Sequence, residues 1–282
     1  SRELDSPYFE GRLSTYIPFN FSSGGWYKGI IPKISYTLTN DMFNTSVSVL
    51  ENPGIVDGYQ YPANPPFIGV TEGKNSFRHY LSGSLRAYTI LSTPNSAVYP
   101  RWGIGAEVGA NKSFNTGNII SPMGYAYLYG YVPGIIREQG LKLSIMHQQK
   151  LDKGSIFGQP MVSVMPRGLT STASLASYMS IMNPSITKFS ADYAIPIYIG
   201  DISIGRGFLY IKRLCLTPHV DFTRAGQTNL MSVGSALTID LNGIVWINWP
   251  ASVGATYSYN GLADYNMIKS STGLDMDLHH VG

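Results

Sequence analysis

Hydrophobic and polar residues alternate along most of this chain with a period of two. In the stretch GYAYLYGYV (residues 124–132), tyrosines fall on one side, and alanine, leucine, glycine and valine fall on the other. This period is typical of a β-strand with two different faces. Helical periodicity of any length is absent, so the pattern predicts an all-β protein. About eleven alternating segments lie near 10–21, 29–39, 78–91, 100–111, 122–133, 140–149, 187–198, 206–222, 229–241, 244–258 and 270–280.

Several of these segments have one face that is suited to lipid. In RWGIGAEVGAN (residues 101–111), one face is apolar and the other carries arginine, glutamate, asparagine and glycines. Residues 187–197 and 245–259 show the same division. A soluble β-sandwich would give the same alternation, and it is the alternative interpretation.

The composition favours a membrane barrel over that sandwich. Charged residues make up 13% of the 282 residues, about half the share that is usual in soluble proteins. The strands are expected to be about 10 to 14 residues long, whereas strands in soluble proteins average about 5 to 6. No apolar run approaches the roughly 18 residues that a membrane helix needs. A closed β-barrel is the other structure that satisfies its backbone hydrogen bonds within a bilayer.

The loops between the segments alternate in length. Residues 40–77 and 150–186 are long, residues 112–121 are of medium length, and residues 92–99 and 134–139 are short. Short turns on one side and long loops on the other are typical of outer-membrane barrels. We therefore expect one transmembrane antiparallel β-barrel over residues 1–282, located in the bacterial outer membrane, with the two longest loops outside the cell.

The tyrosines of residues 124–132 raise the question of which face meets lipid. Tyr125 and Tyr131 are separated by about 20 Å of strand, at roughly 3.3 Å per residue. An aromatic girdle is only about one residue deep at each edge of an apolar band about 25 Å tall. We expect the tyrosines to fill the barrel wall from inside, with Ala126, Leu128 and Val132 facing lipid. The alternative is that the tyrosines contact lipid at both rims.

The C-terminal half carries a series of recognisable segments. These are MPRGLTS (165–171) in the long loop, then FSADYAIPI (189–197), LTPHVDFTRAG (216–226), MSVGSALTIDLNG (231–243), IVWINWPASVGATYSYN (244–260) and TGLDMDLHHV (272–281). The series resembles the C-terminal part of the BamA/TamA-like outer-membrane assembly-barrel superfamily. The phrase YIKRL (210–214) is similar to members that carry a TolB-type propeller before the barrel.

The resemblance implies a barrel of about 16 strands, of which about 11 lie in this chain and about five would precede Ser1. It also implies that the loop 150–186 folds back into the lumen and carries an Arg-Gly-aromatic motif. The arginine of this motif is held by two acids on the next two strands. Residue matching places Arg167, Gly168, Asp192 and Asp221 in this cluster, with Leu169 at the aromatic position.

The chemistry of arginine supports this assignment. Its guanidinium is a planar, permanently charged fork that can pair with two carboxylates. A barrel lumen screens charge less than open solvent does, so a paired Arg167 can pin the loop, plug the pore and brace the wall. The alternative is that Arg167 is a solvated loop charge and that the two acids are ordinary lumen residues.

The resemblance implies a role in the assembly or translocation of outer-membrane proteins. The partners would be the lipid bilayer, periplasmic or outer-membrane proteins, and client outer-membrane proteins. In this mechanism, the seam between the first and last strands opens and its edge templates a client strand. Leu274, Met276 and Leu278 would lie on one side of that seam. The alternatives are a non-catalytic anchor or scaffold subunit of a larger cell-envelope complex and, less favoured because bulky tyrosines and a loop fill the lumen, a solute channel.

Other chemistry finds little support, and we expect no enzyme activity, cofactor or metal. The glycines of GIGAEVG (103–109) alternate along a strand, whereas a dinucleotide-binding loop needs a strand before it and a helix after it. Asp275, Asp277 and His279 share one side of a strand, which is geometrically compatible with a metal, but a polar strand end is the preferred interpretation. A formal charge of +3 without a basic block does not favour nucleic-acid binding. With Cys215 alone, the chain forms no internal disulfide.

Overall fold

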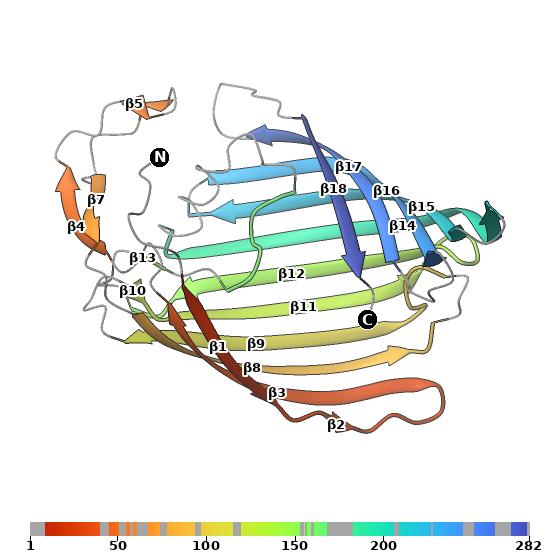
Figure 1. Ribbon diagram of the computed structural model, residues 1–282, viewed down its shortest axis with the longest axis horizontal. Helices are drawn as coiled ribbons and strands as arrows, with labels where there is room; N and C mark the ends of the chain where they lie inside the picture. Colours follow the sequence, from red (N-terminus) through yellow and green to blue (C-terminus); the bar gives the residue numbers. More distant parts are fainter. Residues whose placement is uncertain are drawn as a thin grey trace.

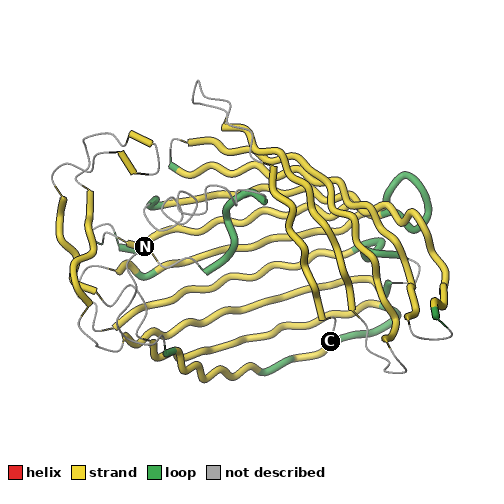
Figure 2. Tube along the Cα trace, turned by 45° about the horizontal axis from the view of Figure 1, so that its top comes forward, coloured by secondary structure: helices red, strands yellow, loops and turns green. Residues whose placement is uncertain are grey.

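The computed structural model describes residues 9–39, 45–50, 55–56, 59–60, 67–73, 78–93, 97–114, 120–152, 155, 157–158, 161–167, 183–205, 209–226, 228–244, 251–262 and 272–280. Over this part of the chain all regular structure is β, and Figure 2 shows only strands joined by loops. Within the same residues, no helix has the length and apolarity needed to cross a membrane.

Twelve strands of the described residues form one antiparallel sheet. They are β1 (Glu10–Tyr16), β2 (Phe19–Asn20), β3 (Trp26–Thr39), β8 (Arg78–Leu91), β9 (Gly103–Phe114), β11 (Met123–Pro133), β12 (Gly140–Lys150), β14 (Ser185–Ile204), β15 (Leu209–Ala225), β16 (Thr228–Ile244), β17 (Ala251–Leu262) and β18 (Thr272–His280). Three small pairs lie apart: β4 (Thr45–Leu50) with β7 (Phe67–Gly73), β5 (Ile55–Val56) with β6 (Tyr59–Gln60), and β10 (Ile120–Ser121) with β13 (Phe157–Gly158).

The sheet is a meander in which each long strand pairs with the next one along the chain. Its order is β1-β3-β8-β9-β11-β12-β14-β15-β16-β17-β18, with β2 added beside β3. Each of the eleven predicted segments overlaps at least one strand of this path, which confirms the all-β antiparallel prediction. Strands β1 and β18 are the two edges, and the described residues do not close into a barrel.

Strand boundaries differ from the prediction mainly in the second half. The segment expected to end near residue 198 continues to Ile204 as the 20-residue strand β14. Its pairing with β15 shifts register between Pro196 and Tyr198, and again between Ile199 and Ile202. Proline has no backbone N–H to donate to the neighbouring strand. A β-bulge or similar irregularity beside Pro196 lets the strand continue past it with a changed pairing register.

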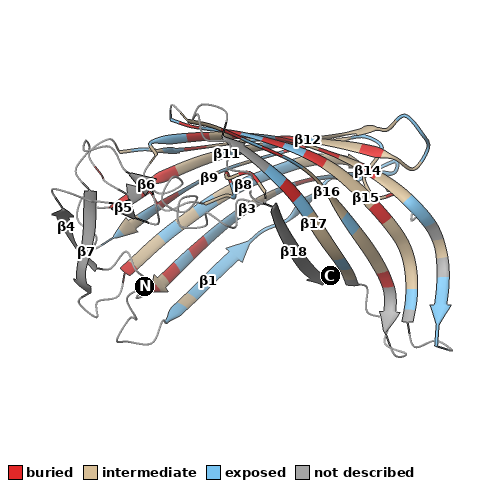
Figure 3. Cartoon of the chain, turned by 90° about the horizontal axis from the view of Figure 1, so that it is seen from above, coloured by how far each residue is buried: buried red, intermediate tan, exposed pale blue. Residues whose placement is uncertain are grey.

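The sheet is strongly curved. In Figure 1, β1 and β18 cross in front of the middle strands, and residues 161–167 lie on this same side. Viewed from above, the sheet forms an arch (Figure 3). We call the concave face, which contacts residues 161–167, the inner face, and the convex face the outer face.

The two faces have the polarity opposite to that of a soluble β-protein. The outer face carries large hydrophobic side chains that are 38–53% exposed, among them Ile34, Leu85, Ile104, Val108, Leu128, Leu143, Ile145, Phe189, Val220, Phe222, Val233 and Leu237. The inner face carries buried polar side chains, among them Ser35, Thr37, Arg78, Asn111, Ser144, Gln148, Lys188, Asp192, His219, Asp221, Ser232 and Ser258. Soluble proteins rarely expose large apolar patches or bury many polar side chains. The two faces of this sheet therefore indicate surroundings other than water on the outside and a dry core on the inside.

The tyrosines of β11 lie on the inner face, where they were expected. Tyr129 is 3% exposed, whereas Leu128 on the opposite side is 46% exposed. Tyr129 lies over Gly105 of the neighbouring strand, where an added Cβ would meet its ring at 2.3 Å. Gly105, like Gly109 beneath Tyr125, therefore leaves room for a tyrosine ring on the inner face.

Candidate functional site

Residues 161–167 are held against the inner face by three successive strands. Lys188 of β14 donates from Nζ to the Met165 carbonyl at 2.9 Å, and Thr223 of β15 donates to the Val164 carbonyl at 2.9 Å. Ser232 of β16 donates to the carbonyl of Arg167 at 2.8 Å. Each strand thus supplies a side-chain donor to one backbone carbonyl of the segment. The segment therefore has hydrogen-bond partners for these carbonyls although it does not pair as a strand.

Arg167 joins this segment to two carboxylates. Its Nη2 lies 2.5 Å from Asp192 Oδ1 and 2.7 Å from Asp221 Oδ1, and its Nε donates to Asp221 Oδ2 at 2.9 Å. The backbone N–H of Arg167 also donates to Asp221 Oδ2, at 2.9 Å. Asp221 thus receives a bidentate guanidinium and a backbone donor, the strongest kind of arrangement for a carboxylate.

The register of β14 and β15 explains how one arginine reaches both acids. Asp192 pairs with His219, and Asp221 pairs with Ser190, so the two acids are diagonal neighbours on one face. Diagonal neighbours on paired strands lie about 7–8 Å apart, a span that one guanidinium can bridge.

The two carboxylates are buried, whereas the Arg167 side chain is 36% exposed, and the charges of the cluster are balanced locally. The Asp221 side chain is fully covered, and Lys188 Nζ lies 3.4 Å from its Oδ2. Burial by itself lowers the pKa of Arg167, but the hydrogen bond to Asp221 and the charges of Asp192 and Asp221 raise this pKa above its ordinary value. Arg167 is therefore charged in this cluster.

A small apolar cluster lies beside these charges. Val164 of the segment packs with Ile186, Ala225 and Leu230, which come from the ends of β14, β15 and β16. All four side chains are at most 2% exposed. The segment is consequently anchored by apolar packing as well as by hydrogen bonds.

The structure thus brings together Arg167, Asp192 and Asp221, three of the four residues that the resemblance placed in one cluster. Gly168 lies outside the described residues. The loop-pinning role of the cluster stays a prediction, although the contacts fit it.

The predicted seam residues lie on the edge strand β18. Leu274, Met276 and Leu278 pair through their backbones with Tyr257, Ala255 and Val253 of β17. Their side chains, like those of Asp275, Asp277 and His279, are not among the described features. The opening of this edge stays a prediction.

A second charged cluster was missed by the sequence reasoning. Arg213 of β15 donates from Nε to Asp240 Oδ2 of β16 at 2.8 Å, and Ser252 of β17 donates to Asp240 Oδ1 at 2.6 Å. Arg213 Nη1 also donates to the Ala97 carbonyl at 2.8 Å. The available signal was a pair of opposite charges at inward positions on consecutive strands.

This cluster holds the loop between β8 and β9 against the inner face. Ala97 is 8% exposed although it lies in a loop that was expected to be a short turn. Tyr99 of the same loop lies beside Tyr131, with ring centroids 5.7 Å apart. Burial raises the pKa of Tyr99, with a further contribution from the charge of Asp192. Loop 97–100 and segment 161–167 therefore both cover the inner face.

His219 shares the inner face with Asp221. Its Nε2 lies 3.0 Å from Oγ of Ser258, which belongs to β17, two strands away. The imidazole ring reaches this serine by lying over Gly234 of the intervening strand β16. A histidine–serine pair is a familiar catalytic combination. Here His219 is 2% exposed and Ser258 is fully buried, so we assign the pair a packing role.

The fold and these clusters define a class of protein: an open, curved antiparallel sheet with an apolar outer face and a polar inner face that holds irregular segments. Comparison with family models, curated protein sequences and solved structures finds no match for this chain.

Proposed function

We propose that this chain belongs to an outer-membrane β-barrel of the BamA/TamA-like superfamily that takes part in the assembly or translocation of outer-membrane proteins. The observation that carries the proposal is the reversed polarity of the sheet. A continuous apolar outer face is stable against lipid acyl chains, and a polar inner face suits an aqueous lumen.

The Arg167 cluster supports the family assignment. The resemblance implied an inward-folded loop whose arginine is held by acids on the next two strands. Arg167 contacts Asp192 of β14 and Asp221 of β15, the two strands that follow the loop. These contacts are independent of the polarity of the two faces, so they support the proposal separately.

Strand parity restricts how such a barrel could close. Ten antiparallel pairings connect β1 to β18, so the two edge strands run parallel to each other. An antiparallel barrel with an even number of strands then requires an odd number of further strands between these edges.

The alternative is a non-catalytic anchor or scaffold of a cell-envelope complex. Its specific support is the crowded inner face, where tyrosines, loop 97–100 and segment 161–167 are held by hydrogen bonds. The same crowding argues against a solute channel.

Depletion of the protein in its own cell, with the outer-membrane proteome quantified before growth fails, separates these functions. An assembly factor predicts that many unrelated barrels fall together. A scaffold predicts the loss of only one or two partners. Recovery of the protein in the soluble fraction would overturn both.

A further inference from the structure

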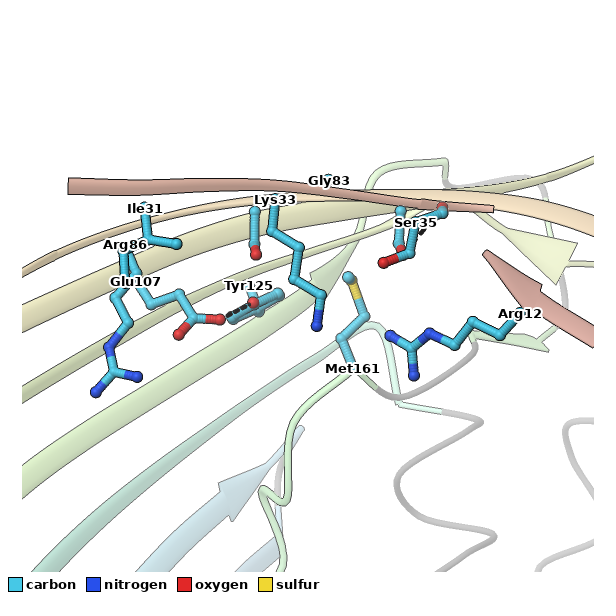
Figure 4. Close-up of a pocket in the computed structure, with 11 residues that line it drawn as sticks. Arg12, Ile31, Lys33, Ser35, Gly83, Arg86, Glu107, Tyr125 and Met161 are labelled. Carbon is cyan, nitrogen blue, oxygen red and sulfur yellow. Dashed lines mark hydrogen bonds between the residues drawn. The ribbon is translucent and has the colours of Figure 1, made fainter. Parts of the chain in front are cut away.

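A cavity of about 360 Å³ opens on the inner face, on the half of the sheet remote from the Arg167 cluster. Figure 4 shows Arg12, Lys33 and Met161 directed into a common space, with Arg86 and Glu107 beside it. Met161 is the first residue of the described segment 161–167, so the cavity lies between this segment and the wall.

The cavity carries an excess of positive charge. Arg12, Lys33 and Arg86 line it, against one carboxylate, Glu107. Glu107 accepts a hydrogen bond from Tyr125, and Arg86 donates to the Tyr129 hydroxyl at 2.8 Å. Among the described residues, the side chains of Arg12 and Lys33 have no ion-pair or hydrogen-bond partner. Within the described part of the chain, two cationic groups therefore face the cavity with their donors free.

Strand register determines where these groups lie. Lys33 of β3 pairs with Ser84 of β8, and Ser35 pairs with Ser82, so hydroxyl groups stand beside the free ammonium. Arg12 comes from the edge strand β1. Because these strands belong to one continuous sheet, the donors are held in place before any ligand arrives, which reduces the entropy lost on binding.

We propose that this cavity binds a small solute that bears phosphate or carboxylate groups. Arginine and lysine form charge-assisted hydrogen bonds with such oxygens. Cavities of about 300–1,000 Å³ hold small molecules, so this one, near the lower limit, suits a compact anion.

Binding would connect two parts of the molecule. The anion would contact Arg12 on the edge strand β1 and Met161 on the inward segment. A ligand that binds only the folded state stabilises it by RT ln(1 + [L]/Kd), so the stabilisation grows with ligand concentration. We expect bound anion to protect β1 from proteolysis as well as to raise the Tm.

The test is calorimetric titration of the full chain, refolded in detergent micelles, with pyrophosphate, citrate and the uncharged sugar trehalose at constant ionic strength. The proposal predicts saturable binding of pyrophosphate or citrate and none of trehalose. The stronger of the two anions identifies the ligand as a phosphate or a carboxylate.

Charge-neutralising variants locate the site. Lys33→Gln and Arg12→Gln should each weaken anion binding at least about tenfold, the effect of losing one charge-assisted hydrogen bond. Lys28→Gln makes the same charge change on β3 outside the cavity and should bind like the wild type. The proposal is overturned if neither anion binds, if trehalose binds equally well, or if Lys28→Gln weakens binding as much as Lys33→Gln does. If Lys33→Gln does not fold, Arg12→Gln tests the same expectation at the other cationic group of the cavity.

Discussion

At the scale of single residues, glycines on β9 determine how tightly the inner face packs. Tyr129 and Tyr125 of β11 lie over Gly105 and Gly109, where an added Cβ would meet their rings at 2.3 and 2.5 Å. Both tyrosines are also held through their hydroxyls, by Arg86 and Glu107 respectively. These rings cannot move without losing a hydrogen bond.

Gly105→Ala should therefore lower the free energy of unfolding by about 1–3 kcal/mol, the usual cost of overpacking. Chemical denaturation in detergent, followed by tyrosine fluorescence, measures this change. Gly83→Ala is the matched control, because its added Cβ would lie 3.9 Å from the nearest atom. Equal stability of the two variants would show that the Tyr129 ring is free to move.

Arg167→Gln should destabilise the fold by about 3 kcal/mol, because it leaves the buried carboxylate of Asp221 without its main partner. This loss of stability lies at the low end of the range for a broken buried ion pair, because Lys188 remains 3.4 Å from Asp221. Limited proteolysis should show faster cleavage within residues 150–186. Arg137→Gln is the control, because its side chain is 87% exposed. Unchanged cleavage in Arg167→Gln would contradict the pinning role.

At the scale of elements, β15, β16 and β17 each contribute one member of the Arg213 cluster, which fixes loop 97–100. Arg213 reaches the Ala97 carbonyl across 116 residues of chain. Strands β14 to β16 hold segment 161–167 in a similar way. Two irregular segments are thus fastened to the same half of the sheet by strand side chains.

The Arg213–Asp240 interaction should show coupling in a double-mutant cycle. Arg213→Gln, Asp240→Asn and the double variant should give a coupling energy of about 0.5–3 kcal/mol in the free energy of unfolding. The side chains are 12% and 18% exposed, so solvent screens the pair only weakly. Additive effects of the two substitutions would mean that the pair does not stabilise these strands.

At the scale of the whole molecule, the apolar outer face leads us to predict how a charged substitution affects insertion of the protein into a lipid bilayer. Leu128 lies in the middle of β11 and is 46% exposed on that face. If this face meets lipid, Leu128→Lys should reduce the stability of the inserted state by about 2–4 kcal/mol. Refolding into lipid vesicles, with the folded fraction read from gel mobility before and after heating, measures the effect.

Ile135→Lys provides the control for this experiment. Ile135 is 94% exposed in the turn between β11 and β12, away from the middle of the strands. Its substitution should leave insertion nearly unchanged. If Leu128→Lys inserts as well as Ile135→Lys, the outer face does not contact the bilayer interior and the membrane proposal fails.

Much of this architecture could be predicted from the sequence. A strand alternates its side chains between two faces, so the polarity of residues 101–111 or 187–197 is enough to separate the outer face from the inner one. The inward position of the β11 tyrosines was expected for a different reason, because four successive tyrosines span more of the strand than an aromatic girdle covers. The contacts of Arg167 with Asp192 and Asp221 were reached only through a resemblance, because alternation alone does not say which inward residues meet.

The sequence by itself thus determined the strands and their two faces, since these depend on neighbouring residues and on the pleat of the backbone. The tertiary structure decided which inward groups come together. The register shifts in β14, the Arg213 cluster with its distant Ala97, and the cavity of Arg12 and Lys33 all depend on the pairing and curvature of many strands. These properties arise from contacts between residues far apart in the chain, and the pattern within any one segment does not specify them.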